Sequence, residues 1–184
     1  MGITLSLIRH GEASGNWDST VDPCLSDLGK DQADEVALNV SQATVPQWIY
    51  SSPLARARET AEPFGLNWQR EIEIAPQLIE VPSAGVALTE RRKWLTNVLQ
   101  GRWADQAIHL QDWRANILDF ARSQKYDAVF VTHFVVINSL VGAAIGSDDV
   151  VVFKPGHCSV TKILLENGQL SLIEKGEEAA TVIR

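Results

Sequence analysis

The sequence predicts an α/β fold of three layers, α/β/α, with a mostly parallel central sheet and an antiparallel edge. Segments of strand and helix character alternate along most of the 184 residues. The run DAVFVTH (127–133) is apolar almost throughout, which is typical of a strand buried on both faces of a parallel sheet. Near the end, Asn167 and Gly168 separate two strand-like runs and indicate a hairpin. We expect one domain over residues 1–184, with a helical insertion at about 83–123 over the carboxyl edge of the sheet.

The composition excludes several classes of function. A hydrophobic content of 45% with 21% charged residues is usual for a folded protein, and no apolar run has the length of a membrane span. The net charge of −7 disfavours binding to nucleic acid or to an anionic membrane, because both need a basic surface. Cys24 and Cys158 stand far apart in no metal-type spacing, which favours reduced thiols. Without a visible signal peptide, we expect a cytoplasmic protein.

The first strand and helix are marked by local signals. Residues 3–8 predict a strand, and a polar loop that contains Gly15 carries the chain away from its end. Ser26 is expected to cap a helix that runs to about residue 41, since apolar positions then recur at helical spacing.

The second strand and helix follow in the same order. QWIYS (47–51) predicts a strand, and Ser52 with Pro53 predicts a capped helix start, because proline is favoured at the first helical position. We expect this helix to end near Gly65. Alternating residues at 70–74 predict a short extended segment.

The second half of the chain predicts helices on both sides of the apolar strand. Helical patterns cover roughly 86–100 and 105–123 before it, and 134–145 after it, where Gly146 ends the helix. VVFK (151–154) is interpreted as a further short strand. Three tryptophans in the inserted helices predict core packing rather than ligand stacking, namely Trp94, Trp103 and Trp113.

Basic side chains gather where the predicted strands end. The first strand ends at Arg9 and His10, and the apolar strand ends at His133. Ligands bind beyond the carboxyl ends of strands in open parallel sheets, and the helix after the apolar strand begins there with free amides that favour an anion. Arg56 lies in the first turn of the second helix and points toward this edge, whereas Arg58 points about 200° away. The sequence therefore predicts a phosphate site at this edge.

The chain resembles the histidine phosphatase superfamily, the phosphoglycerate-mutase-like family. Arg56 occupies the arginine place of the family's SPLxRAxxT pattern, and LIE (78–80) fits its LxE pattern, which makes Glu80 the candidate acid. VPSAG follows where the family usually has a glycine-rich segment. The other matching segments are LIRHGE (7–12), Asn16, LSDLGKDQA (25–33), SSPLARARETA (51–61) and VTH (131–133).

The resemblance implies a metal-independent phosphomonoesterase that needs no cofactor and acts on a small phosphorylated metabolite. His10 would be the nucleophile and form a phosphohistidine that water then hydrolyses. Glu80 would donate a proton to the leaving alkoxide. The phosphoryl group would be bound by Arg9, Arg56, His133 and Asn16, and His133 would also be catalytic.

Three alternatives stay open at the level of sequence. A cofactor-dependent phosphoglycerate mutase would share the core, although family mutases are longer and carry more basic residues after the acid. A phosphohistidine protein phosphatase is a short-chain relative, and a non-catalytic phosphoester-binding protein would keep the pocket without turnover. We expect a small-molecule partner and make no prediction about oligomers. His109 is placed outside the core site. His157 could approach the pocket from the loop before the last hairpin but is kept outside the core site, and Glu12 is expected to orient the turn after His10 or to pair with an arginine.

Overall fold

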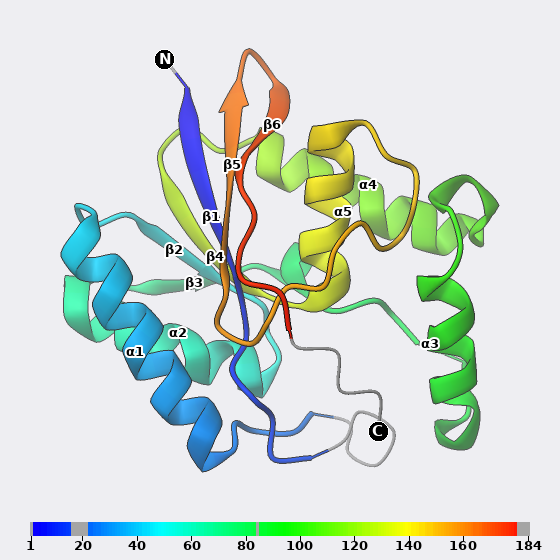
Figure 1. Ribbon diagram of the computed structural model, residues 1–184, viewed down its shortest axis with the longest axis horizontal. Coiled ribbons are helices and arrows are strands. Elements are labelled where there is room, and N and C mark those ends of the chain that lie inside the picture. The colour runs from blue at the N-terminus through cyan, green and yellow to red at the C-terminus, as the bar shows by residue number, and fades with distance from the viewer. Residues whose placement is uncertain (1, 16–21, 84, 180–184) are drawn as a thin grey trace.

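The computed structural model describes residues 2–15, 22–83 and 85–179 and contains a mixed sheet with helices on both faces (Figure 1). The strands are β1 Ile3–Arg9, β2 Trp48–Ser51, β3 Ile72–Ile74, β4 Ala128–Thr132, β5 Val160–Glu166 and β6 Gln169–Glu174. They form a six-stranded sheet in the order β3-β2-β4-β1-β5-β6. The pairs from β3 to β1 are parallel, and β5 pairs antiparallel with β1 and β6. The predicted fold class is confirmed.

The helices make the two outer layers. They are α1 Asp27–Ala43, α2 Ala55–Trp68, α3 Arg91–Leu99, α4 Ile108–Arg122 and α5 Phe134–Ile145. Figure 1 shows α1 and α2 together on one side of the sheet and α4 and α5 on the other. Across the part of the chain that the structure describes, no helix combines the length and apolar character that a membrane crossing requires.

The core is divided between the two faces of the sheet because side chains of a strand point alternately to opposite sides. Ile8, Val129 and Val131 pack with α1 and α2, while Leu7 and Phe130 pack with α4 and α5. All five residues of β4 are buried. The apolar run at 127–133 therefore correctly predicted a strand with helices on both faces of the sheet.

Two local predictions are confirmed by backbone geometry. The Ser26 hydroxyl accepts a hydrogen bond from the N–H of Gly29 and caps α1. Asn167 and Gly168 have φ of 52° and 77°, the left-handed values that a tight hairpin turn between β5 and β6 requires.

The predicted start and end of the second helix are wrong. α2 begins at Ala55, and its N-cap residue Leu54 has no side-chain cap. The carboxylate of Asp22 instead accepts hydrogen bonds from the N–H of Ala55 at 2.9 and 3.1 Å. Ser52 lies three residues before the helix, where its hydroxyl accepts from the N–H of Leu54 at 3.3 Å and lies 2.7 Å from Nε2 of His133. The helix also continues through Gly65 to Trp68.

The predicted strand at 151–154 is also wrong. The backbone N–H groups of Val152 and Phe153 both donate to Oδ1 of the buried Asn138 on α5. The amide oxygen of Asn138 thus accepts the hydrogen bonds that a neighbouring strand would otherwise accept, and the segment is irregular. The extended segment predicted at 70–74 does form a strand, β3, over its last residues and pairs with β2.

The inserted helices lie in two places. Figure 1 shows α3 apart from the other helices, beside the end of the sheet where β1 and β4 finish, whereas α4 lies next to α5. Trp103 and Trp113 are buried with ring centroids 6.0 Å apart, and Trp94 packs half-buried against the same core. The prediction that these tryptophans are core residues is confirmed.

Candidate active site

A cavity of about 540 Å³ opens at the carboxyl edge of the sheet. Its lining includes Arg9 and His10 from the end of β1, Arg56 from the first turn of α2, and Glu80 from the loop after β3. His133, at the end of β4, is fully buried, and its ring centroid lies 5.1 Å from that of His10. Five of the predicted site residues, Asn16 excepted, are therefore brought together.

His10 is held as a neutral imidazole with a defined tautomer. Its Nδ1 lies 2.7 Å from the carbonyl oxygen of Gly11, which can only accept, so Nδ1 carries the proton. Nε2 accepts from Nε of Arg56 at 3.2 Å. Burial, together with the charges of Arg56 and Arg9, holds the pKa of His10 well below its ordinary value of 6.5. The lone pair of Nε2 is therefore available at neutral pH.

The turn after His10 is fixed by close contact with the start of α1. The N–H of Gly11 donates to the hydroxyl of Thr60, and a Cβ on Gly11 would lie only 2.5 Å from the carbonyl oxygen of Gly29. Glu12 accepts a hydrogen bond from the Ser26 hydroxyl at 2.8 Å. The helix cap and the turn thus share one network, as the sequence interpretation of Glu12 expected.

The two arginines keep some buried donors unpaired. Arg9 donates from Nη1 to the carbonyl of Pro155 at 2.8 Å, and its guanidinium lies 5.6 Å from the ring centroid of Phe134. Arg56 is 4% exposed, and its Nη1 lies 3.7 Å from the Asp22 carboxylate. Within the described residues, Nε of Arg9 and Nη1 of Arg56 are buried without a hydrogen-bond partner.

His133 presents a third unpaired donor. The Ser52 hydroxyl accepts from the N–H of Leu54 and lies 2.7 Å from Nε2 of His133, so the hydroxyl proton is free to bond that nitrogen. When the hydroxyl donates to Nε2, the proton of the neutral ring resides on Nδ1, which is buried and has no partner among the described residues. Burial, with the charges of the neighbouring site residues, holds the pKa of His133 well below 6.5.

The surroundings of Glu80 favour the protonated form of its carboxyl group. Its residue faces the cavity, yet its carboxyl group is closely surrounded by protein, and this burial raises its pKa above the ordinary value of 4.5. The backbone N–H groups of Val81 and Val135 and the charges of Arg56 and Arg9 oppose that rise. Val81 donates to Oε1 at 2.9 Å.

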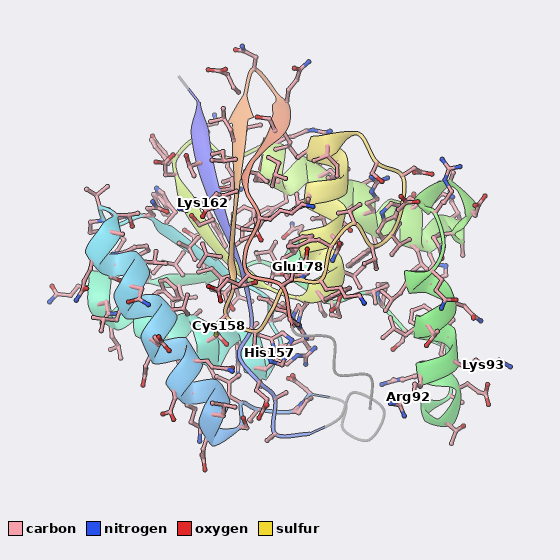
Figure 2. All side chains as sticks on the ribbon, viewed as in Figure 1. Arg92, Lys93, His157, Cys158, Lys162 and Glu178 are labelled. Carbon is pink, nitrogen blue, oxygen red and sulfur yellow. The ribbon has the colours of Figure 1, made fainter. Side chains whose placement is uncertain are left out.

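His157 is a residue of the cavity that sequence reasoning left outside the core site. It lies on the loop before β5 (Figure 2), and its ring centroid is 5.9 Å from that of His10. Desolvation and the charge of Arg9 lower its pKa to about 4, against the opposing charge of Glu12. The same loop bonds Arg9, whose carbonyl accepts from the N–H of Cys158. The predicted antiparallel edge could have indicated this position of His157. A strand that pairs antiparallel with β1, as β5 does, brings the loop before it beside the end of β1.

Other candidates lie elsewhere. Asn16, predicted to bind phosphate, falls outside the described residues. Arg58 and His109 are exposed, in agreement with their exclusion from the site. Exposed Arg92 and Lys93 project from α3 (Figure 2). Among residues 2–15, 22–83 and 85–179, no group of three histidine, cysteine or carboxylate side chains has a spacing suited to a metal ion.

A second cavity of about 540 Å³ lies between α1 and the β5–β6 hairpin. His157 lines this cavity too, together with residues such as Lys162, Cys158 and Glu178, which Figure 2 labels. It contains neither arginine of the candidate site nor His10. We therefore assign the chemistry to the cavity at the strand ends.

Several solved structures with this fold bear the names of phosphatases. The chain superposes on a mycobacterial glucosyl-3-phosphoglycerate phosphatase with a TM-score of 0.75 and 21% identity, covering 98% of this chain and 100% of that one. Phosphoserine phosphatase from Entamoeba histolytica, in complex with 3-phosphoglyceric acid, gives 0.74 and 21%, with 95% and 97% covered. Alpha-ribazole phosphatase from Shigella flexneri gives 0.74 and 20%, with 99% and 100% covered. These identities establish a shared fold.

The family follows from the sequence itself. No curated protein matches the chain closely enough to count as a relative. The sequence model of the histidine phosphatase superfamily (branch 1), however, matches residues 5–177, which include every helix and strand described above except the first two residues of β1. The chain therefore belongs to the histidine phosphatase superfamily (branch 1) and is a phosphoric monoester hydrolase of the histidine phosphatase type.

Proposed function

We propose that this protein hydrolyses small phosphate monoesters through a phosphohistidine formed on His10. The observation that carries the proposal is a set of buried nitrogen atoms at the site that have no hydrogen-bond partner among the described residues: Nε of Arg9, Nη1 of Arg56 and Nδ1 of His133. Buried donors without partners are costly, and an anion that accepts from all three offsets that cost. A phosphoryl group supplies three such oxygens.

In the first step, Nε2 of His10 attacks phosphorus with its lone pair. The bond from phosphorus to the ester oxygen breaks, and that oxygen takes the proton of the Glu80 carboxyl group as it leaves. Arg56, which donates to Nε2 in the absence of substrate, turns its Nε–H to the phosphoryl oxygens. This exchange frees the nucleophile only when phosphate is present.

In the second step, a water molecule replaces the alcohol. The Glu80 carboxylate takes a proton from the water as its oxygen bonds to phosphorus, and the P–N bond returns its electron pair to Nε2. Phosphate leaves, and both groups regain their starting protonation. The arginines and His133 neutralise the charge on the phosphoryl oxygens in both steps.

The position of Glu80 supports a phosphate ester as the substrate. An alkoxide is a poor leaving group and needs a proton, and burial raises the pKa of the Glu80 carboxyl group, which favours the form that can donate one. The titles of the structural relatives name phosphorylated metabolites of low mass, which agrees with a small-molecule substrate.

The test is the hydrolysis of an aryl phosphate such as p-nitrophenyl phosphate by His10→Ala. We expect kcat to fall by about a thousandfold or more, because the covalent route is lost. The matched control is His109→Ala, since His109 is exposed on α4 away from the cavity. Wild-type activity should persist with a metal chelator. Full activity in His10→Ala, or loss of activity with chelator, would overturn the mechanism.

A further inference from the structure

The cavity at the strand ends has a charged side and an apolar side. Its charged groups belong to the residues discussed above, which surround the proposed phosphoryl position. The remaining described lining includes Val81, Leu95, Leu99, Phe134 and Val135. Leu95, Leu99 and Phe134 are only partly buried, although each is a large apolar side chain. We call Val81, Leu95, Leu99 and Phe134 the apolar wall.

The wall begins at the proposed proton donor. Val81 follows Glu80 directly, so the first apolar contact lies next to the carboxyl group that would protonate the departing oxygen. The carbon skeleton attached to that oxygen must therefore extend along this side of the cavity, because the phosphoryl group occupies the side of the arginines.

Helix α3 supplies the far part of the wall. Leu95 and Leu99 are four residues apart and share one face of the helix, and both line the cavity. The exposed charges of Arg92 and Lys93 are not part of the cavity lining. Helix α3 thus offers the cavity a leucine face over about one helical turn.

Phe134 supplies a flat surface beside the phosphoryl site. It is the first residue of α5, directly after His133, and its ring lies 5.6 Å from the Arg9 guanidinium. An aromatic leaving group could lie against this ring without losing hydrogen bonds. Hydroxyl, carboxylate or ammonium groups would lose their bonds to water against the wall, and no polar side chain of the wall replaces them.

We propose that the substrates of this phosphatase carry an apolar leaving group, either alkyl or aryl, which binds against Val81, Leu95, Leu99 and Phe134. This inference rests on the proposed function for the reaction at phosphorus. It separates this chain from the amino-acid and sugar-acid phosphates named in the titles of two structural relatives, whose substituents are strongly polar.

The test is a series of straight-chain alkyl phosphates, from ethyl through butyl to hexyl phosphate. Their leaving alcohols have nearly equal acidity, so differences in kcat/KM report binding of the alkyl chain. We expect kcat/KM to rise with chain length, by up to about fourfold for each methylene that the wall buries. Propyl phosphate should also be preferred to glycerol 3-phosphate, which has the same number of carbons but two added hydroxyls.

Variants assign the preference to the wall. Leu95→Asn should lower the ratio of hexyl to ethyl kcat/KM by at least about fivefold. Leu38→Asn is the matched control, because Leu38 is half exposed on α1, outside the cavity, and should leave the ratio unchanged. Leu99→Asn provides a second variant if Leu95→Asn does not fold.

Binding of non-hydrolysable ligands separates this inference from the proposed function. Hexylphosphonate should bind wild-type protein more tightly than methylphosphonate by calorimetry. If no ester is hydrolysed but this preference holds, the apolar site stands and the proposed function fails. If esters are hydrolysed with equal kcat/KM for all chain lengths, or with glycerol 3-phosphate preferred, the proposed function stands and the apolar site is overturned.

Discussion

At the scale of single residues, the protein shifts the pKa values of two ionisable groups of the cavity in opposite directions. Burial and two arginines lower the pKa of His10, which favours the neutral imidazole, whereas burial raises the pKa of Glu80, which favours the protonated carboxyl group. Both shifts favour the forms that the proposed mechanism needs, a nitrogen with a lone pair and an acid with a proton. This pairing is the usual sign of an acid and a nucleophile that act in one step.

Glu80→Gln should separate two classes of substrate. Alkyl phosphate turnover should fall by about a hundredfold, whereas aryl phosphate turnover should fall much less, because a phenolate leaves without a proton. In the wild type, kcat for alkyl esters should decline as pH rises through the Glu80 pKa. Steady-state kinetics over a pH series measures both effects. Equal losses for the two substrate classes would remove Glu80 as the acid.

His157→Asn tests the residue that the sequence analysis set aside. His157 faces the phosphoryl end of the cavity, near His10, so its loss should weaken binding of every ester alike. We expect KM to rise by about threefold to tenfold, the value of one neutral hydrogen bond, with kcat little changed. The hexyl to ethyl ratio should stay constant. A changed ratio, or an unchanged KM, would contradict a role at the phosphoryl end.

The positions of site residues could be predicted where a residue stands at the end of a strand or at the start of a helix. Arg9, His10 and His133 stand at strand ends, and Arg56 stands in the first turn of a helix, so their meeting follows from topology. The contribution of Asp22 could not be predicted, because it accepts from Ala55 across 33 residues and no local pattern indicates that contact.

At the scale of elements, the start of α1 is pressed against the turn that carries His10. Gly29 lies in the first turn of α1, and a Cβ added there would collide with the carbonyl oxygen of Glu12. A Cβ added to Gly11 would likewise collide with the carbonyl oxygen of Gly29. Neither collision involves a flexible side chain that could rotate away. The position of His10, the proposed nucleophile, is thus set by how closely α1 approaches the end of β1.

Gly29→Ala should therefore damage both stability and activity. The helix must retreat from the turn, which costs about 1–3 kcal/mol of unfolding free energy as an overpacked contact and displaces His10, so kcat should fall at least about tenfold. Urea denaturation and steady-state kinetics measure the two effects. Gly142→Ala is the control in α5, where an added Cβ meets its first neighbour at 3.4 Å. Equal behaviour of the two variants would contradict the role of this contact.

Element types were predictable from periodicity, whereas element ends were decided by distant side chains. β4 and α1 matched their patterns closely. The helix predicted from Ser52 begins instead at Ala55, whose N–H donates to the carboxylate of Asp22, 33 residues away. The strand predicted at 151–154 failed because Asn138 occupies its backbone donors. In each case a tertiary hydrogen bond outcompeted a local preference.

At the scale of the whole molecule, burial of the site residues couples folding to pH. His10 and His133 have folded pKa values below 6.5, so the unfolded chain binds more protons than the folded one as pH falls below that value. Their contribution to stability is present above about pH 6.5 and is lost as pH falls toward the folded pKa values. The raised pKa of Glu80 acts in the opposite direction, since its folded form gains a proton first.

The unfolding free energy should therefore decrease between about pH 7 and about pH 5. The slope should approach about 1.4 kcal/mol per pH unit for each histidine that remains neutral in the folded state. Urea denaturation across this range gives the slope, and His10→Ala should reduce it by about one proton whatever its effect on overall stability. An unchanged slope in His10→Ala would show that His10 takes up its proton in the folded state.

The architecture could be predicted because sequence order and spatial order are linked by simple rules. Parallel strands joined by helices, with a hairpin at one edge, account for the sheet and for both helical layers. The insertion at about 83–123 was expected to lie over the carboxyl edge of the sheet, and α3 does line the cavity there. The packing of α4 against α5, on a face of the sheet, was not expected (Figure 1). The family resemblance supplied the candidate acid, and the structure supplied its surroundings.

The order of the central strands has a consequence for how the protein refolds. β2, β4 and β1 lie side by side, yet β4 is separated from β1 by more than a hundred residues of chain. His10 and His133 can meet only after this long loop has closed, a step whose entropic cost slows folding. Recovery of enzymatic activity after dilution from denaturant should therefore lag behind the recovery of helical circular dichroism. The rate at which activity returns would then report the last stage of folding.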